Sequence, residues 1–314
     1  MFSAVGWCLA FCPGAMAVSF YFSPKYHGAA LGMTIAGIGM GMFTAPILVE
    51  TLTDVYTWRG SLLIQAAINL NIVVFGAVLF PVAGTKKNAN YMEISLLKNW
   101  IFVNFLLYVA LFLVGVSVMS VHLSYTVQTS LGASPKEAAL VVSTLGIGGT
   151  LGRLIHGIVS KLPKVNALAQ QMSVFFLLGV LTVLIPFMKA YSLMIVVAAF
   201  MGFFQGALSV TAVITIYVVG LKSRIAGYGF FNLAAGLGMV SGAPIAGFLY
   251  DRTGNYDVSM YFGGGVIIVA VMTMIVILLT RWGDVMARYR AEEEAPEQIP
   301  VNQGTRTSLE DELA

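Results

Sequence analysis

The chain has 314 residues, of which 58% are hydrophobic and only 10% are charged, and its mean hydropathy is +0.87. Charged residues make up about 25% of a typical soluble domain, so this composition excludes that class and indicates a protein of the lipid bilayer. The formal net charge of +3 gives no basis for binding nucleic acid.

Apolar runs of about 20 residues, the length that a helix needs to cross a bilayer, recur along the chain. Because these runs do not alternate apolar and polar side chains as the strands of a membrane barrel do, we predict helices. We therefore expect an all-α membrane protein with nine spans. In chain order they are 2–22, 28–49, 60–81, 100–121, 138–158, 168–187, 191–216, 226–249 and 259–280.

The loops between these spans carry an uneven distribution of basic residues. Of the seventeen Lys and Arg residues, eleven fall on one side of the predicted membrane and four on the other. Basic loops favour the cytoplasm, so we predict an external N-terminus and a cytoplasmic C-terminus. On this topology residues 82–98 form a cytoplasmic linker, and residues 283–314, which are rich in Glu and Pro, form a disordered cytoplasmic tail.

An internal repeat relates two of the spans. Ala-Gly-Ile-Gly-Met at 36–40 precedes Ala-Pro-Ile at 45–47, and Ala-Gly-Leu-Gly-Met at 235–239 precedes Ala-Pro-Ile at 243–245. Such duplication is typical of secondary transporters, whose two related bundles rock around a central site. We place Pro46 and Pro244 in equivalent positions, with a gating or packing role.

The register of the repeat divides the chain into two unequal halves. Glycine is enriched in every third span, at 28–49, 138–158 and 226–249, as expected of three-helix units nested in six-helix halves. Residues 1–81 are then a partial N-terminal half with three spans, and residues 99–282 are a full six-helix half. Three further helices are expected before Met1, so the chain is either a truncated product or gene model, or a natural short form.

The residues of both halves resemble the monocarboxylate transporter family of the major facilitator superfamily. The resemblance covers residues 1 to about 282 and implies that the family's first three helices are absent. The Trp-Arg-Gly tract at 58–60 is fairly specific in that context. The first half matches at Tyr21, Phe22, Lys25, Ala30, Gly32, Ala36, Gly37, Ala45, Pro46, Tyr56, Trp58, Arg59, Gly60, Ser61, Asn71, Gly76 and Pro81, and the second half at Gly242, Pro244, Gly247, Asp251, Gly254 and Tyr256.

This resemblance implies a major facilitator-type helical bundle that carries a small organic anion, a monocarboxylate or a related metabolite, by alternating access. It also implies the plasma membrane as location, and it admits a single-span escort protein as a partner. The alternative that we keep is a truncated, non-transporting membrane protein, either a remnant or a regulatory partner of a full-length transporter. Nothing in the sequence indicates an enzyme, a cofactor or a metal site, because it holds no phosphate-binding loop and no cluster of metal ligands.

Arg153 is the strongest candidate for contact with a substrate. No other Lys or Arg lies well inside a predicted span, where a charge is costly. Its planar guanidinium suits a carboxylate, and by resemblance it matches the family's membrane arginine. The alternative is a gate residue that extends to the cytoplasmic surface. Proton-coupled members resemble one another in an aspartate one turn earlier, where this chain has Gly149. We therefore predict weak or no proton dependence, with symport and facilitated diffusion both open.

Three further polar residues are candidates for substrate binding. Gln205 and Ser209 resemble the family's tenth-helix tract, with Gln205 in place of the usual Phe, and Asn232 is a third candidate. All three have a second interpretation as hydrogen-bonded contacts between helices. His156 follows Arg153 by three residues, and it is either a proton relay or a hydrogen-bonded packing residue.

Two short polar loops complete the set of candidates. Trp58 and Arg59 open the third predicted span, and Asp251 lies beside Arg252 in the loop before the last span. For both loops we favour a structural role, in which a local pair locks the turn.

Overall fold

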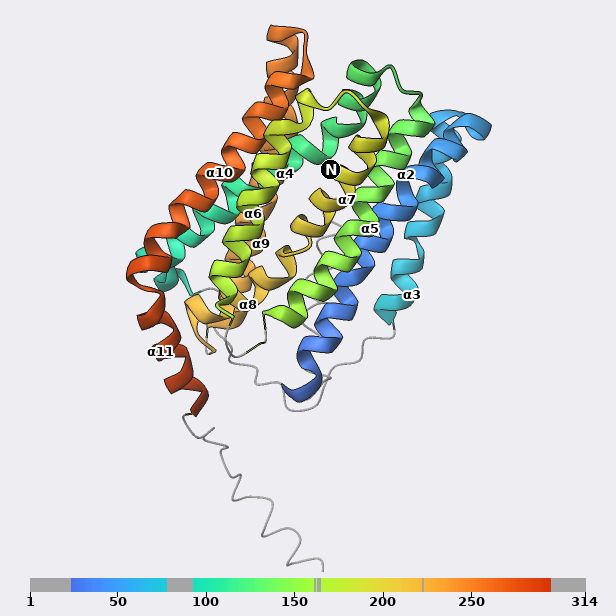
Figure 1. Cartoon of the computed structure of the whole chain (residues 1–314). Coiled ribbons are helices and arrows are strands. Elements are labelled where there is room, and N and C mark those ends of the chain that lie inside the picture. The colour runs from blue at the N-terminus through green and yellow to red at the C-terminus, as the bar shows by residue number, and fades with distance from the viewer. Residues whose placement is uncertain (1–23, 78–92, 161, 163–164, 222, 295–314) are drawn as a thin grey trace, which may run out of the picture.

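The chain is described by a computed structural model, which defines residues 24–77, 93–160, 162, 165–221 and 223–294. Within these ranges the chain forms helices and no strands, as Figure 1 shows. The elements are α2 (Pro24–Asn69), α3 (Asn71–Ala77), the short 3-10 helix η1 (Ile94–Lys98), α4 (Trp100–Leu131), α5 (Pro135–Val159), α6 (Ala167–Leu184), the 3-10 helix η2 (Ile185–Phe187), α7 (Tyr191–Gln205), α8 (Leu208–Val219), α9 (Arg224–Thr253), α10 (Tyr256–Thr280) and α11 (Trp282–Glu294).

Seven segments of the described residues are long and apolar enough to span a membrane, so the predicted all-α membrane fold is confirmed, while the count of nine is not. The first segment, Gly37–Ala77, has 41 residues, about twice what one crossing needs. It is broken at Thr57 (φ 61°, ψ 172°), where the chain turns back from the blue part of α2 toward α3 (Figure 1). It therefore overlaps the predicted spans 28–49 and 60–81, whereas residues 78–81 and the whole of the predicted span 2–22 lie outside the described residues.

Aromatic residues of α4 form the centre of the main core. Phe102, Phe105, Tyr108 and Phe112 are all at most 1% exposed, and the Phe112 ring stacks on Phe175 of α6 with centroids 3.8 Å apart. Helix α4 packs against α9 and α10, α6 packs against α10, and α5 packs against α7. These helices therefore share one continuous core.

Helix α2 joins this group through α5. Glycines lie on both sides of the contact: a Cβ atom on Gly39 would overlap Thr150, and one on Gly146 would overlap the backbone of Met42 and Phe43. Small residues let membrane helices approach closely, so these glycines bring the backbones of α2 and α5 together. At one end of the contact, Lys136 Nζ of α5 lies 2.8 Å from Asp54 Oδ2 of α2.

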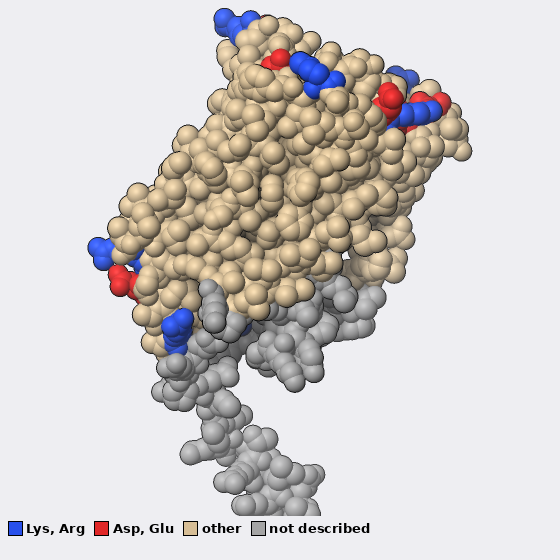
Figure 2. Space-filling model, viewed as in Figure 1, with Lys and Arg blue, Asp and Glu red and all other residues tan. Residues whose placement is uncertain are grey.

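Charged side chains are confined to the two ends of the bundle on the face that Figure 2 shows, with a broad uncharged band between them. This distribution is expected of helices that cross hydrocarbon, where charge is costly. Pro46 and Pro244 lie inside α2 and α9 respectively. Their equivalence by symmetry stays a prediction.

Helix α11 corrects part of the predicted disordered tail. Residues 282–294 are helical, and Trp282 and Val285, one turn apart, are 6% and 4% exposed. Arg288 donates a hydrogen bond from Nη2 to the carbonyl of Val218, at the end of α8. The acidic composition of this segment conceals a short apolar stripe that is sufficient to dock the helix, whereas residues 295–314 lie outside the described part of the chain.

Candidate functional site

Arg153 lies six residues before the end of α5 and is buried within the bundle, with 5% of its surface exposed. Its guanidinium folds back over Gly149, where a Cβ atom would lie 2.8 Å from Nη1. Nη1 has no hydrogen-bond partner in the described structure. The ion pairs of the described residues join Lys136 to Asp54 and Arg281 to Asp284, so none supplies a carboxylate to Arg153. The site is a buried cation whose charge no described acidic side chain neutralises.

The predicted span 191–216 consists of two helices, and the break between them faces Arg153. Helix α7 ends at Gln205, a turn follows at Gly206 and Ala207, and α8 begins at Leu208. The turn touches α5 directly, because a Cβ atom on Gly206 would lie 2.5 Å from the backbone nitrogen of Arg153. Only glycine permits this approach. Interrupted helices at mid-membrane are a recurring feature of transporter binding sites.

The structure brings Ser209 and Gln205 to this break but leaves Asn232 on another helix. Ser209 Oγ lies 3.2 Å from the carbonyl oxygen of Arg153 and donates to it. Gln205 is the last residue of α7 and is 6% exposed. Asn232 Nδ2 donates to the carbonyl of Tyr228 at 2.8 Å, within α9. Of the three polar candidates, Ser209 thus contacts the arginine, Gln205 lies at the break between α7 and α8, and Asn232 bonds its own helix.

His156 lies one turn beyond Arg153 and is 6% exposed. Its Nδ1 is 3.2 Å from Gln170 Nε2 of α6, which also lies 3.3 Å from the carbonyl oxygen of His156. Because the amide nitrogen of Gln170 is a donor, Nδ1 accepts, and the proton of the neutral ring is then on Nε2, which has no partner in the described structure. The ring also packs on Phe203, with centroids 4.8 Å apart.

A buried glutamine that sequence analysis missed holds the break in place. Gln171 of α6 is fully buried, and its Nε2 donates to the carbonyl of Ala207 at 3.1 Å and also bonds Thr211 Oγ1. An amide without hydrogen-bond partners is costly in an apolar core. A glutamine inside a predicted span therefore indicates a hydrogen bond to a neighbouring helix. Gln170 and Gln171 were the two residues that carried this signal in the span 168–187.

The predicted loop residues have local partners. The guanidinium of Arg59 lies 5.0 Å from the ring centre of Trp58, at the turn after Thr57. The guanidinium of Arg252 lies 5.2 Å from the ring centre of Phe248. The described ion pairs do not include Asp251 with Arg252, so the expected local pair is replaced by a contact between cation and ring.

The chain is similar to known transporters both in sequence and in fold. The sequence model of the Major Facilitator Superfamily matches residues 1–217 and 105–309. Among curated relatives, Monocarboxylate transporter 13 of Rattus norvegicus is 32% identical over 269 residues, covering 84% of this chain and 62% of the relative. Monocarboxylate transporter 10 of Danio rerio is 28% identical, covering 83% of this chain and 54% of the relative.

Solved structures agree on the fold. The fucose:proton symporter FucP of E. coli superimposes with a TM-score of 0.59 at 12% identity, covering 86% of this chain and 73% of that chain. A bacterial homolog of the human lysosomal transporter Spinster gives a TM-score of 0.51 at 14% identity, covering 91% and 76%. At such identities the likeness concerns the fold alone. The chain spans 62–63% of the length of its first two curated relatives.

These findings confirm the predicted resemblance and the predicted class of multi-pass membrane protein. They also agree with the prediction that the chain is not an enzyme, since the proteins that it matches are transporters. The sequence match reaches both halves of the chain, and the helical bundle is that of solved members. The chain belongs to the Major Facilitator Superfamily, and the curated relatives that it resembles are monocarboxylate transporters.

Proposed function

We propose that this chain serves the transport of a small organic anion, a monocarboxylate or a related metabolite, across a membrane by alternating access. The observation that carries the proposal is the buried guanidinium of Arg153, whose Nη1 lacks a partner and which no described carboxylate neutralises. A buried charge is stable only when it is paired. An anionic substrate would supply the missing charge, with hydrogen bonds to the guanidinium fork.

The surroundings of Arg153 support a site that opens and closes. The break between α7 and α8 touches the backbone of Arg153 through Gly206, and Ser209 donates to its carbonyl. Movement of α8 relative to α7 would therefore move the site directly. Gln205, the last residue of α7, is a candidate to add a hydrogen bond to a polar substrate.

The proposal extends to coupling and orientation. In the described spans the acidic side chains lie near helix ends, and Gly149 stands one turn before Arg153. We therefore infer weak or absent proton coupling, with His156 as the titratable group next to the site. The basic loops favour a cytoplasmic C-terminus in the plasma membrane. An escort protein stays a prediction, and no comparison supports the alternative of a non-transporting remnant.

Uptake into proteoliposomes tests the proposal. The full chain is reconstituted and offered labelled lactate, pyruvate or a wider panel of organic anions, with and without an inward proton gradient. Arg153→Met should reduce uptake of the transported anion at low substrate concentration by about tenfold or more, since loss of a charge-assisted pair costs about 1.5–3 kcal/mol. The matched control is Arg252→Met, which removes an exposed arginine at a turn and should leave uptake unchanged.

The same variants separate the two roles of Arg153. If Arg153 binds the substrate, Arg153→Met raises the apparent KM or eliminates saturable uptake. A variant that keeps its affinity and loses turnover would assign Arg153 to the gate instead. Normal uptake by Arg153→Met would overturn the proposal, and strong acceleration by an inward proton gradient would contradict the inference on coupling.

A further inference from the structure

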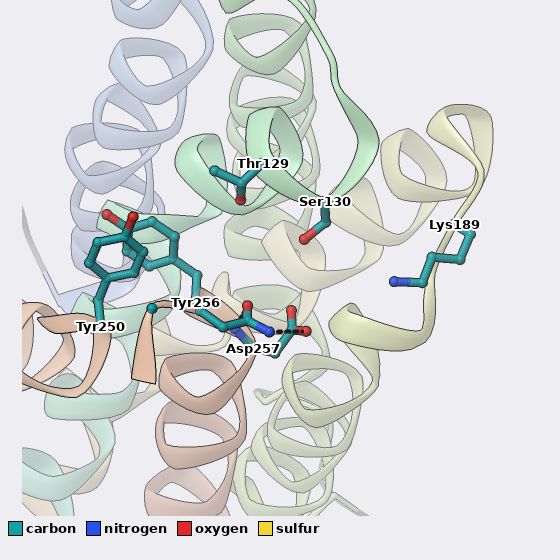
Figure 3. Close-up of a pocket in the computed structure, with 8 residues that line it drawn as sticks. Thr129, Ser130, Lys189, Tyr250, Tyr256 and Asp257 are labelled. Carbon is teal, nitrogen blue, oxygen red and sulfur yellow. Dashed lines mark hydrogen bonds between the residues drawn. The ribbon is translucent and has the colours of Figure 1, made fainter. Parts of the chain in front are cut away.

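A pocket of about 340 Å³ opens at the end of the bundle opposite to α11. Its wall is built from three separate parts of the chain: the last turn of α4 with Thr129 and Ser130, the connection before α7 with Lys189, and the turn between α9 and α10 with Asn255 and Asp257 (Figure 3). None of its lining residues belongs to α2 or α5. The pocket is therefore separate from the site around Arg153.

Lys189 brings an uncompensated positive charge to this pocket. Its ammonium group points into the space between Ser130 and Asp257 in Figure 3. Lys189 takes part in neither of the ion pairs of the described residues. No described carboxylate oxygen therefore lies within 4.0 Å of its Nζ. The hydroxyl group of Ser130 lies across the space and can donate to the same anionic group. This side of the pocket suits a carboxylate.

Asp257 brings an unsatisfied negative oxygen to the opposite wall. Its Oδ2 accepts a hydrogen bond from Asn255 Nδ2 at 2.8 Å, but its Oδ1 is buried and has no partner in the described structure. A buried carboxylate oxygen without a donor is unfavourable by a few kcal/mol, of the order of a lost charged hydrogen bond. This side of the pocket suits a group that donates hydrogen bonds and carries positive charge.

The wall that holds Asp257 is fixed before any ligand arrives. Asn255 caps α10, and its Oδ1 accepts from the backbone nitrogen of Asp257 at 2.9 Å. The ring of Tyr256 stacks between Tyr250, at 4.1 Å, and Tyr125, at 5.8 Å between ring centres. Groups that are already ordered lose little entropy on binding, so the carboxylate is presented in one orientation.

We propose that this pocket is a binding site for a small zwitterion, whose carboxylate pairs with Lys189 and whose ammonium group pairs with the carboxylate of Asp257. The two protein charges are opposite and are not paired with each other, so a ligand with both charges satisfies both walls at once. The volume lies at the small end of ligand sites, which matches a short amino acid. On the predicted topology the site faces the outside of the cell, and it goes beyond the proposed transport of anions.

Binding of three related probes to the full chain in lipid nanodiscs tests the proposal. L-Alanine carries both charges, propionate lacks the ammonium group, and ethylamine lacks the carboxylate. Affinities are measured by saturation-transfer NMR titration. We expect alanine to bind at least about tenfold more tightly than either fragment, because each charge-assisted pair is worth that much or more.

Variants assign the binding to this pocket. Lys189→Met and Asp257→Asn should each weaken alanine binding by about tenfold or more, whereas Arg153→Met and the exposed-lysine control Lys98→Met should not change it. Lys189 is exposed and lies in the loop before α7, so Lys189→Met should not disturb folding. It still tests the proposal if Asp257→Asn disturbs the start of α10. Equal affinity for alanine and propionate, an unaffected Lys189→Met, or loss of alanine binding in Arg153→Met would each overturn the proposal.

Discussion

The helices from α4 to α10 and the segment α2–α3 are all apolar enough to span a membrane, but most of the former are packed far more tightly than the latter. In the most apolar window of Trp100–Leu131, 56% of the residues are buried, against 6% in that of Gly37–Ala77. The first group encloses a core around the aromatic residues of α4, whereas among the described helices α2 packs tightly against α5 alone. Hydropathy predicts which segments enter the membrane, but it does not predict which of them pack against one another.

The difference follows from the physics of the bilayer. Lipid chains are as apolar as leucine, so an apolar side chain gains little by moving from lipid into a protein core. What a core adds is close packing and hydrogen bonds, and these depend on shape. The segment α2–α3, with Leu63 and Phe75 more than 70% exposed, is therefore compatible with lipid or with further helices on its open faces.

The largest expected effect is on the free energy of unfolding. It is measured with one substitution in the core around α4 and one in the exposed segment α2–α3. Phe112→Ala removes a ring that stacks on Phe175 at 3.8 Å, and we expect a loss of about 3 kcal/mol in the free energy of unfolding, the lower end for buried Phe→Ala, because the transfer contribution is small in lipid. Phe75→Ala, at a ring that is 72% exposed, should cost less than about 0.5 kcal/mol. Unfolding in lipid or mild detergent measures both. Equal losses of unfolding free energy in the two variants would show that burial in the core and exposure on α3 stabilise the chain to the same extent.

An intermediate effect is expected at the contact between the two regions. Gly146→Ala places a methyl group against the backbone of Met42 and Phe43, which cannot rotate away, so we expect a loss of about 1–3 kcal/mol. Gly157→Ala in the same helix meets open space, and the better helix propensity of Ala should stabilise the chain by up to about 1 kcal/mol.

Hydrogen exchange locates the effect of these two glycine substitutions. Gly146→Ala should speed exchange of the backbone amides of α2 while leaving α4 protected, because the overlap concerns only the contact between α2 and α5. Gly157→Ala should leave α2 as it is. Faster exchange across α4 and α10 in Gly146→Ala would mean that the two regions unfold as a single unit, which would remove the distinction between them.

Much of this architecture is predictable from local pattern, because a run of about 20 apolar residues has few alternatives to a membrane helix. Arg153 is predictable for the same reason, since a charge in such a run is conspicuous. The turn at Thr57 coincides with the polar stretch Asp54–Trp58. In each case the signal is contained in a short stretch of sequence, and the structure agrees with it.

The rest depends on contacts between distant parts of the chain. The break at Gly206 lies in a run that is apolar on both sides, and the reason for it, the approach of α5, is absent from the local sequence. Helix α11 is stabilised by burial of Trp282 against α8 and α10, which its charged residues conceal. Lys189 and Asp257 become one pocket only because α4, α7 and α10 bring their ends together.

The smallest expected effect concerns the ion pair that joins the two regions. Lys136 and Asp54 approach to 2.8 Å, but their side chains are 71% and 47% exposed, so we expect a coupling free energy close to zero. A double-mutant cycle with Lys136→Met and Asp54→Asn measures it, with Arg281 and Asp284, a pair at 3.5 Å within the other region, as the control.

The consequence of that ion pair should appear in conformation more than in stability. If α2 and α5 separate at this end during transport, the pair stabilises the closed arrangement, and even a small stabilisation shifts the population toward that arrangement. The single variants should therefore increase the labelling of a cysteine introduced at Thr150, which faces Gly39 across the contact, and the exchange Lys136→Asp with Asp54→Lys should restore the original rate. High salt should reduce the difference, because exposed charges are screened within about 3 Å at 1 M. Unchanged labelling in both single variants would mean that glycine packing alone holds the two regions together.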